Sequence, residues 1–137
     1  MDKVIFNTAG DGFWSDVINA QVEITDMQVD YIDDDFQGPD PQFGELRVYF
    51  NTNTWNVDEH GLIYTDSLFL KQLRAFLDTH GLPGSDVDYS EQGMQGDDYV
   101  SLDVGGAFLQ SWGRKFNIDW QAMVRAQHAA VIARWGN

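Results

Sequence analysis

The sequence predicts an α+β fold, in which two or three helices pack on one face of a mostly antiparallel sheet. Alternating apolar and polar residues, typical of strands, fill much of the first half and recur near residue 100. Two later segments have helical spacing and clear capping residues. The order of strands, helix, strand and helices favours an antiparallel sheet. With 137 residues and 43% hydrophobic content, we expect residues 1–137 to form a single acidic α+β domain.

Three segments of the first half have the pattern of strands. Residues 3–7 are expected to form a short strand. Residues 20–32 alternate in polarity, but the phase slips by one position at Asp26, which predicts either a long bulged strand or a hairpin. Residues 44–51 form the next predicted strand, and the turn residues that follow favour a hairpin returning through residues 61–65.

Residues 66–80 are the clearest helix in the sequence. Thr65 or Asp66 can cap its N-terminus. Gly81 followed by Pro83 ends it. At 100° per residue one stripe is apolar, as expected for a face turned to the core, and consists of Phe69, Leu70, Leu73, Phe76 and Leu77.

The second half continues with a long polar connection over residues 81–98, a strand over 99–104 and a short helix over 105–116. Asp119 is expected to cap a final helix over 120–135. One side of this helix carries Trp120, Val124, Val131 and Trp135. The other carries Ala122, Ala126, Ala129, Ala130 and Ala133. Such an alanine face allows close approach of a second element, either from the same domain or from another subunit in a homodimer.

The charge of the chain is strongly acidic and uneven. It has 22 acidic and eight basic residues, for a net charge of −14. Residues 1–70 contain fourteen of the acids and two of the bases. Because like charges repel, this half is not expected to bind nucleic acid or an anionic membrane directly, and it suits a basic protein surface instead. The alternative is that the acidity serves solubility or adaptation to high salt.

Cysteine is absent, which excludes disulfides and thiolate metal sites. The N-terminus lacks the pattern of a signal peptide. No apolar run approaches the ~20 residues that span a bilayer. We therefore expect a soluble cytoplasmic protein without a cofactor.

The strongest candidate for a metal site is residues 86–97, where Asp86, Asp88, Ser90 and Asp97 have the spacing of calcium ligands in an EF-hand loop. Glu91 replaces the glycine of the sharp turn, and Asp97 replaces the longer glutamate that chelates through both oxygens. These departures argue against calcium, and no metal site is predicted.

The three histidines show no paired spacing of metal ligands. His60, with Glu59 or Asp66 nearby, is the basis of one alternative, a small metal-dependent enzyme. His80 is explained by the end of its helix, where a cation is favoured. His128 is expected at the edge of the core. No nucleophile motif, dinucleotide fingerprint or P-loop is present, so no catalytic residue is assigned.

The densest acidic segment is residues 29–41, VDYIDDDFQGPDP. Spread over half of the surface, the acids of the first half are about twofold more dilute than the charge of duplex DNA, whereas a local cluster can match it. Two aromatic residues between the acids can serve as apolar anchors at an interface, or face the core. The candidate partner-binding residues are Asp26, Asp30, Tyr31, Asp33, Asp34, Asp35, Phe36 and Asp40.

These observations predict a non-enzymatic acidic protein that docks its N-terminal half on a basic surface of another protein. The sharpest version is a mimic of nucleic acid that inhibits a nucleic-acid-binding protein. In general character, small, acidic and cysteine-free, the chain resembles the anti-restriction and anti-CRISPR inhibitors of bacteriophages, although no motif carries the resemblance. The second alternative is an accessory domain whose charge serves solubility and which dimerises through the last helix.

Overall fold

A computed structural model describes residues 2–5, 11–32, 41–55, 63–90, 96 and 98–135 of the chain. Its strands form an antiparallel sheet in the order β1-β3-β4-β6-β5, and β2 pairs with the first part of β3. The strands are β1 (Asp2–Ile5), β2 (Gly12–Ser15), β3 (Ala20–Ile32), β4 (Phe43–Phe50), β5 (Val87–Tyr89) and β6 (Tyr99–Gly105).

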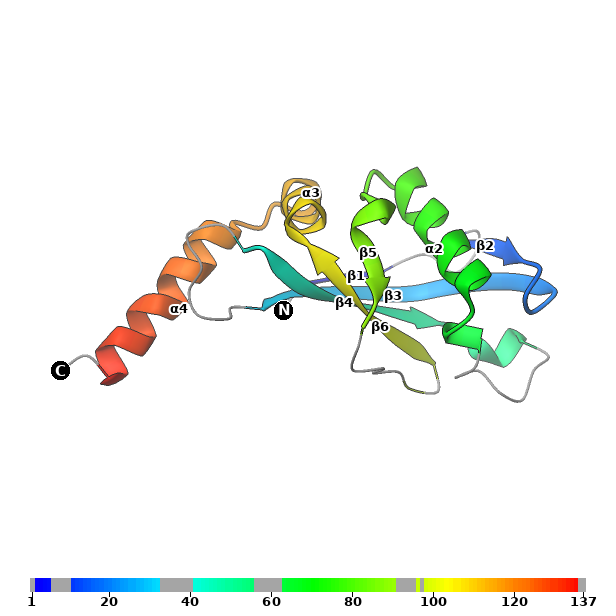
Figure 1. The fold of residues 1–137 in the computed structure, drawn as a ribbon, viewed down its shortest axis with the longest axis horizontal. Helices are drawn as coiled ribbons and strands as arrows, with labels where there is room; N and C mark the ends of the chain where they lie inside the picture. The colour runs from blue at the N-terminus through cyan, green and yellow to red at the C-terminus, as the bar shows by residue number, and fades with distance from the viewer. Residues whose placement is uncertain are drawn as a thin grey trace.

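Two helices, α2 (Ser67–Thr79) and α3 (Gly106–Phe116), lie on the same face of the sheet, whereas α4 (Trp120–Trp135) extends away from it (Figure 1). Two short 3-10 helices, η1 (Thr52–Thr54) and η2 (Gly84–Asp86), are also described. The predicted α+β fold, with a mostly antiparallel sheet and helices on one face, is confirmed.

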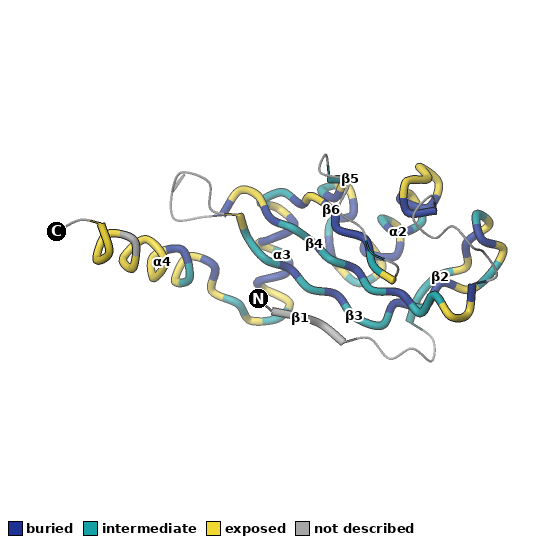
Figure 2. Tube along the Cα trace, turned by 90° about the horizontal axis from the view of Figure 1, so that it is seen from below, coloured by how far each residue is buried: buried dark blue, intermediate teal, exposed yellow. Residues whose placement is uncertain are grey.

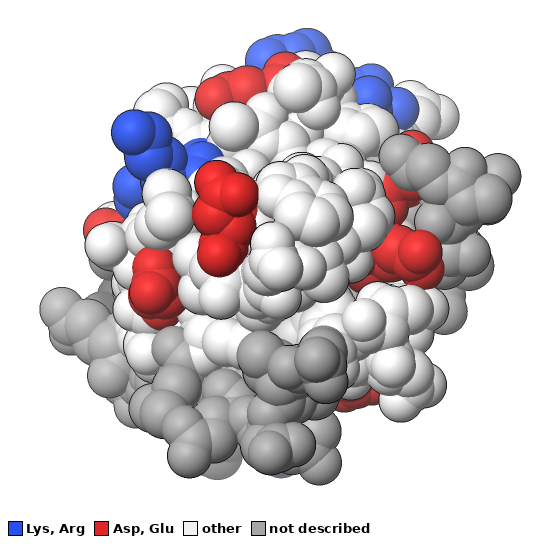
Figure 3. All heavy atoms as spheres, turned by 90° about the vertical axis from the view of Figure 1, so that its right-hand side faces the viewer, with Lys and Arg blue, Asp and Glu red and all other residues white. Residues whose placement is uncertain are grey.

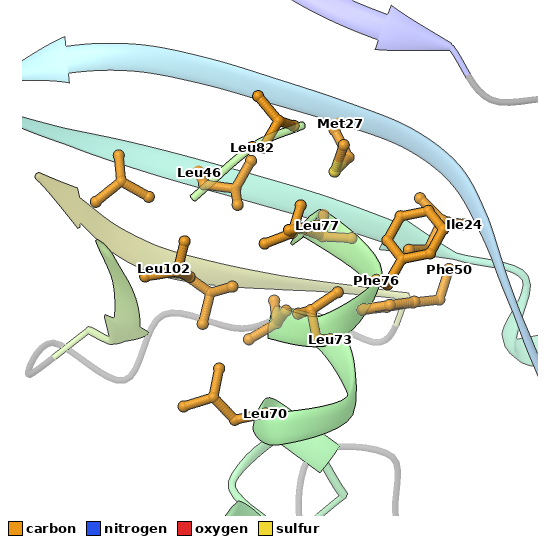
Figure 4. Close-up of a cluster of buried hydrophobic side chains, with 14 of the residues drawn as sticks. Ile24, Met27, Leu46, Phe50, Leu70, Leu73, Phe76, Leu77, Leu82 and Leu102 are labelled. Atoms are coloured by element: carbon orange, nitrogen blue, oxygen red, sulfur yellow. The ribbon is translucent and has the colours of Figure 1, made fainter. Parts of the chain in front are cut away.

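The core lies between this face of the sheet and the two helices. The apolar stripe predicted for α2 is buried in full. Of its side chains, Leu73, Phe76 and Leu77 point towards the strands (Figure 4). From the sheet, Leu46 and Leu102 contribute fully buried side chains. Each such side chain stabilises the fold by about 1.5–3 kcal/mol relative to exposure. The Asp66 carboxylate caps α2, as predicted, by accepting hydrogen bonds from the backbone N–H groups of Leu68 and Phe69.

The phase slip in residues 20–32 is a bulge within one continuous strand. Ile24 pairs with Phe50 and Asp26 with Tyr49, so β3 has one residue more than β4 between these two pairs. The extra residue restores the alternation, because Val22 and Ile24 before it and Met27 after it are all fully buried. The bulged strand is therefore confirmed, and the alternative of a hairpin is not.

The hairpin predicted from residues 44–51 back through residues 61–65 is wrong. Strand β4 pairs with β3 on one side and with β6 on the other, so both of its edges are occupied. Ile63 and Tyr64 are helical and buried. Tyr64 instead stacks on the ring of Phe50, with 5.4 Å between the ring centroids. The apolar character of Ile63 and Tyr64 therefore reflects packing in the core rather than strand pairing.

Two short strands are absent from the sequence-based prediction. Strand β2 forms a hairpin with β3, in which Ser15 pairs with Ala20. Strand β5 lies within residues 81–98, which were expected to be a polar connection, and it forms the edge of the sheet beside β6. Segments of three or four residues are too short to show a period, and only their pairing defines them as strands.

Only the first turns of α4 pack on the domain. Trp120 and Val124 are buried, and the indole N–H of Trp120 donates to the carbonyl of Leu109 at 2.7 Å. Asp119 caps the helix, as predicted, by accepting from the N–H of Ala122. The predicted alanine face is exposed throughout, and so is Trp135 (Figure 2). The alternative in which the alanine face packs against another element of the same domain is therefore wrong.

Candidate functional site

The sheet has a second face, opposite α2 and α3, whose side chains are mostly polar. Along each strand these residues alternate with the buried apolar ones. They include Asp26, Gln28 and Asp30 of β3, Glu45, Arg47 and Tyr49 of β4, Tyr99, Ser101 and Asp103 of β6, and Asp88 of β5. We call this surface the open face.

Strand register brings four carboxylates into one line across the open face. Asp30 pairs with Glu45, Glu45 pairs with Asp103, and Asp103 pairs with Asp88. Neighbouring strands are about 4.8 Å apart, so the four positions span roughly 14 Å. We call these four residues the acidic row. Like charges directly opposite each other in a sheet are destabilising, so packing within the domain does not account for the arrangement.

Two members of the acidic row have a cationic partner. The Glu45 carboxylate lies 3.1 Å from the guanidinium of Arg47, and Asp88 lies 3.5 Å from that of Arg74. Within the described ranges, no ion pair involves Asp30 or Asp103. The row therefore alternates between partly neutralised and uncompensated carboxylates.

Arg47 is held in place beside the row. Its guanidinium lies over the ring of Tyr99, 5.0 Å from the ring centroid. A hydrogen bond with Tyr49 and the interaction with Glu45 raise the pKa of Arg47, against the opposing effect of burial. The cation next to the row is therefore permanently charged and limits the net negative charge at its centre.

The sequence-predicted residues that the structure describes fall on both faces of β3. Asp30 belongs to the acidic row. Asp26 also lies on the open face, where one carboxylate oxygen accepts from the side-chain amide of Gln28 at 3.2 Å and the other is buried without a hydrogen-bond partner. Tyr31 lies on the helix-covered face, with its ring 5.7 Å from that of Trp120. Its hydroxyl donates to the side-chain oxygen of Gln127 and lies 3.4 Å from the carbonyl oxygen of Met123.

The other predicted members of the binding segment, Asp33, Asp34, Asp35, Phe36 and Asp40, lie outside the described residues. Sequence reasoning missed Glu45, Asp88 and Asp103. Glu45 and Asp103 occupy polar positions in two predicted strands of alternating polarity. This alternation indicates which face of the sheet they occupy, but not which residues of other strands lie beside them. Only the pairing of four strands from both halves of the chain brings them next to Asp30.

The residues of the EF-hand-like spacing have other roles in the structure. The Asp86 carboxylate accepts from the backbone N–H of Phe108 at 2.9 Å and so caps α3. Asp88 belongs to the acidic row, and Asp97 lies outside the described residues. In the part of the chain that the structure describes, no three His, Asp or Glu side chains come together as metal ligands.

Of the histidines, His60 and the neighbouring Glu59 lie outside the described residues. His80 follows the end of α2, as predicted, and its ring lies 4.5 Å from that of Phe76. His128 is exposed on α4, so the expectation that it lies at the edge of the core is wrong, because only the first turns of this helix reach the domain. Asp66, the remaining residue of the enzyme alternative, caps α2.

A groove of about 550 Å³ lies at the end of the acidic row. Its apolar side includes Ile32 and Phe43, and its acidic side includes Asp86, Asp88 and Asp103. At the end of the molecule that carries β2, acidic and basic side chains are interspersed with uncharged ones over the described surface (Figure 3). The groove therefore joins two apolar side chains to three carboxylates.

Comparison of the chain with protein-family models, curated proteins and solved structures finds no match. Among the described helices, none has the length and hydropathy that crossing a membrane requires.

Proposed function

We propose that this protein is a non-enzymatic acidic binding protein, and that the open face docks on a basic surface of another protein. The observation that carries the proposal is the acidic row. It extends the predicted site from one segment of the chain, residues 26–40, to four strands. It also replaces Tyr31, which packs inside the domain, with Glu45, Asp88 and Asp103 as binding residues.

The energetics of the row support a role in binding. Charges that serve only solubility are best distributed with both signs interspersed, and cross-strand pairs of opposite charge stabilise a sheet. Here Asp30 and Glu45 are direct neighbours, and so are Asp103 and Asp88. Each like-charged pair costs about 0.2–1 kcal/mol, which a basic partner would offset on binding.

The sharper version of the proposal is that the partner is a nucleic-acid-binding protein and that the row imitates a phosphate backbone. Its residues follow each other at the strand spacing of about 4.8 Å, whereas one strand of duplex DNA has one phosphate per ~3.4 Å of axis. The row is thus within about 1.5-fold of that linear density. Arg47 and Arg74 lower its net charge, so mimicry also requires Asp33, Asp34 and Asp35, which follow β3 in the chain.

The test compares two double variants with the same net charge. Asp30→Asn with Asp103→Asn removes the two uncompensated carboxylates of the row. The control, Asp16→Asn with Asp98→Asn, removes two exposed acids outside it. Binding of an oligo-arginine peptide and of a panel of purified DNA-binding domains is measured at low and high salt. We expect the row variant to weaken binding by roughly three- to tenfold, and the control by less than about twofold.

Equal weakening by the two variants would mean that only net charge matters, which is the solubility alternative. The sharper version has its own readout, because a mimic must compete with duplex DNA for the same domain. A domain that binds the protein and DNA simultaneously would rule out mimicry for that partner while leaving the docking proposal intact.

A further inference from the structure

Helix α4 exposes apolar side chains along most of its length. Beyond Val124, every described side chain is exposed, including Ile132 at 52% and Trp135 at 77%. The helix projects from the domain rather than lying along it (Figures 1 and 2). Large apolar side chains on one side and alanines on the other make the helix apolar on more than one side, a pattern typical of a helix that another element covers.

The groove at the end of the acidic row is the second exposed apolar surface. Ile32 and Phe43 on its apolar side are exposed to 42% and 56%. In the described ranges six large hydrophobic side chains are exposed, and four of these belong to α4 or to the groove. The two surfaces therefore hold most of the large hydrophobic side chains that this part of the molecule exposes to water.

The charges of the two surfaces are complementary. Residues 120–135 contain Arg125 and Arg134 and no acidic residue, although the chain as a whole has a net charge of −14. The groove is lined by three carboxylates, Asp86, Asp88 and Asp103, and by one cation, Arg74. A basic apolar helix thus matches an acidic apolar groove.

The helix cannot fill the groove of its own chain. Its start is anchored to the domain by the bond from Trp120 to Leu109 and by the packing of Tyr31 on Trp120. The remaining turns run straight away from the sheet (Figure 1). At 1.5 Å per residue, the exposed part is about 16 Å long and would have to break to fold back.

We infer that a second copy of this chain covers both surfaces, with the end of α4 from each copy lying in the groove of the other. Such an exchange is self-complementary and closes as a two-fold symmetric dimer. It places Ile132 and Trp135 against Ile32 and Phe43, and Arg134 near the carboxylates. Because Asp88 and Asp103 line the groove and belong to the acidic row, the dimer would compete with a basic partner. The inference goes beyond the proposed function and does not depend on it.

The test measures the mass of the full chain by sedimentation equilibrium across a range of concentrations. We expect a dimer that Trp135→Ser and Phe43→Ser each weaken by at least about tenfold. Leu68→Ser is the matched control, since Leu68 is an exposed apolar residue of α2 outside both surfaces. Circular dichroism of each variant shows whether it is folded, and a variant that unfolds is replaced by Ile132→Ser or Ile32→Ser.

Mixing the two variants is the sharpest arm of the experiment. The Phe43→Ser chain has an intact α4 and the Trp135→Ser chain has an intact groove, so their mixture restores one of the two contacts. We expect the mixture to dimerise more tightly than either variant alone. A wild-type chain that is monomeric at every concentration would overturn the inference. A dimer that Trp135→Ser dissociates but Phe43→Ser does not would overturn it too, because the helices would then pair with each other.

Discussion

The two faces of the sheet are built from the same strands and differ in what their cross-strand neighbours do for the fold. On the covered face Val29, Leu46 and Leu102 form one line of fully buried apolar side chains. On the open face, one position along each strand, Asp30, Glu45 and Asp103 form a line of carboxylates. The first line stabilises the fold by burial, whereas the second opposes it by repulsion.

This difference indicates that stability of the fold explains the residues of the covered face but does not explain the acidic row. The next line on the open face contains Gln28, Arg47 and Ser101, which shows that the same strands also hold mixed polar neighbours. The acidic row is therefore a local feature of the open face rather than a property of every position on it.

The largest expected effect is on the covered face. Leu46→Ala removes a fully buried side chain from the centre of the sheet and should lower the free energy of unfolding by about 2–5 kcal/mol, through lost burial and the cavity left behind. Asp30→Ala, on the open face of the neighbouring strand, is the control and should not destabilise the fold. Urea denaturation measures both. Equal losses would mean that the open face also supports the fold.

Asp86 connects the two faces, since it lines the groove and caps α3 on the covered face. Its carboxylate lies so close to Gly105 that a Cβ there would meet it at 2.4 Å. Asp86→Ala removes the acceptor of the Phe108 N–H and should destabilise the protein by about 1 kcal/mol through loss of the cap. Ser85→Ala, at an exposed neighbouring position, should leave the melting temperature unchanged. An unchanged melting temperature in the Asp86 variant would show that this carboxylate does not stabilise the fold as a cap of α3.

Neutralising the row should act in the opposite direction. Asp103→Asn removes repulsion from Glu45 and Asp88 and should stabilise the fold by about 0.2–1 kcal/mol, while it weakens binding to a basic partner. The gain should shrink as salt is added, because salt screens exposed charges. Asp98→Asn, just before β6, is the control. A loss of stability in the Asp103 variant would mean that its charge supports the fold.

The last effect is confined to alkaline pH and concerns Tyr89 at the edge of the sheet. Burial, followed by the charge of Asp66, raises the pKa of its phenol from 10.0 to about 12. Between these two values the unfolded chain loses the phenol proton while the folded chain keeps it, so stability falls as pH rises through this window. Tyr89→Phe should remove this part of the alkaline loss. Urea denaturation below pH 10 and near pH 12 measures it, and identical pH dependence in both proteins would contradict the assignment.

The helices and long strands could be predicted because their information is local. The apolar stripe of α2 and the alternation along β3, including its phase slip, depend only on residues a few positions apart. The same reasoning failed for the return strand expected over residues 61–65, because Ile63 and Tyr64 are helical and pack in the core. It also failed for β2 and β5, whose three or four residues contain no measurable period.

The sequence by itself determined the α+β class, the capped helix α2, the bulged strand and the strong acidity, because each follows from composition or from spacing along one segment. Only the tertiary structure decided which carboxylates are neighbours. Asp30, Glu45, Asp103 and Asp88 come from four strands, and their alignment depends on the order and register of the sheet. The exposure of α4 likewise depends on the tertiary structure, because the arrangement of the preceding elements determines whether any surface lies close enough to cover the helix.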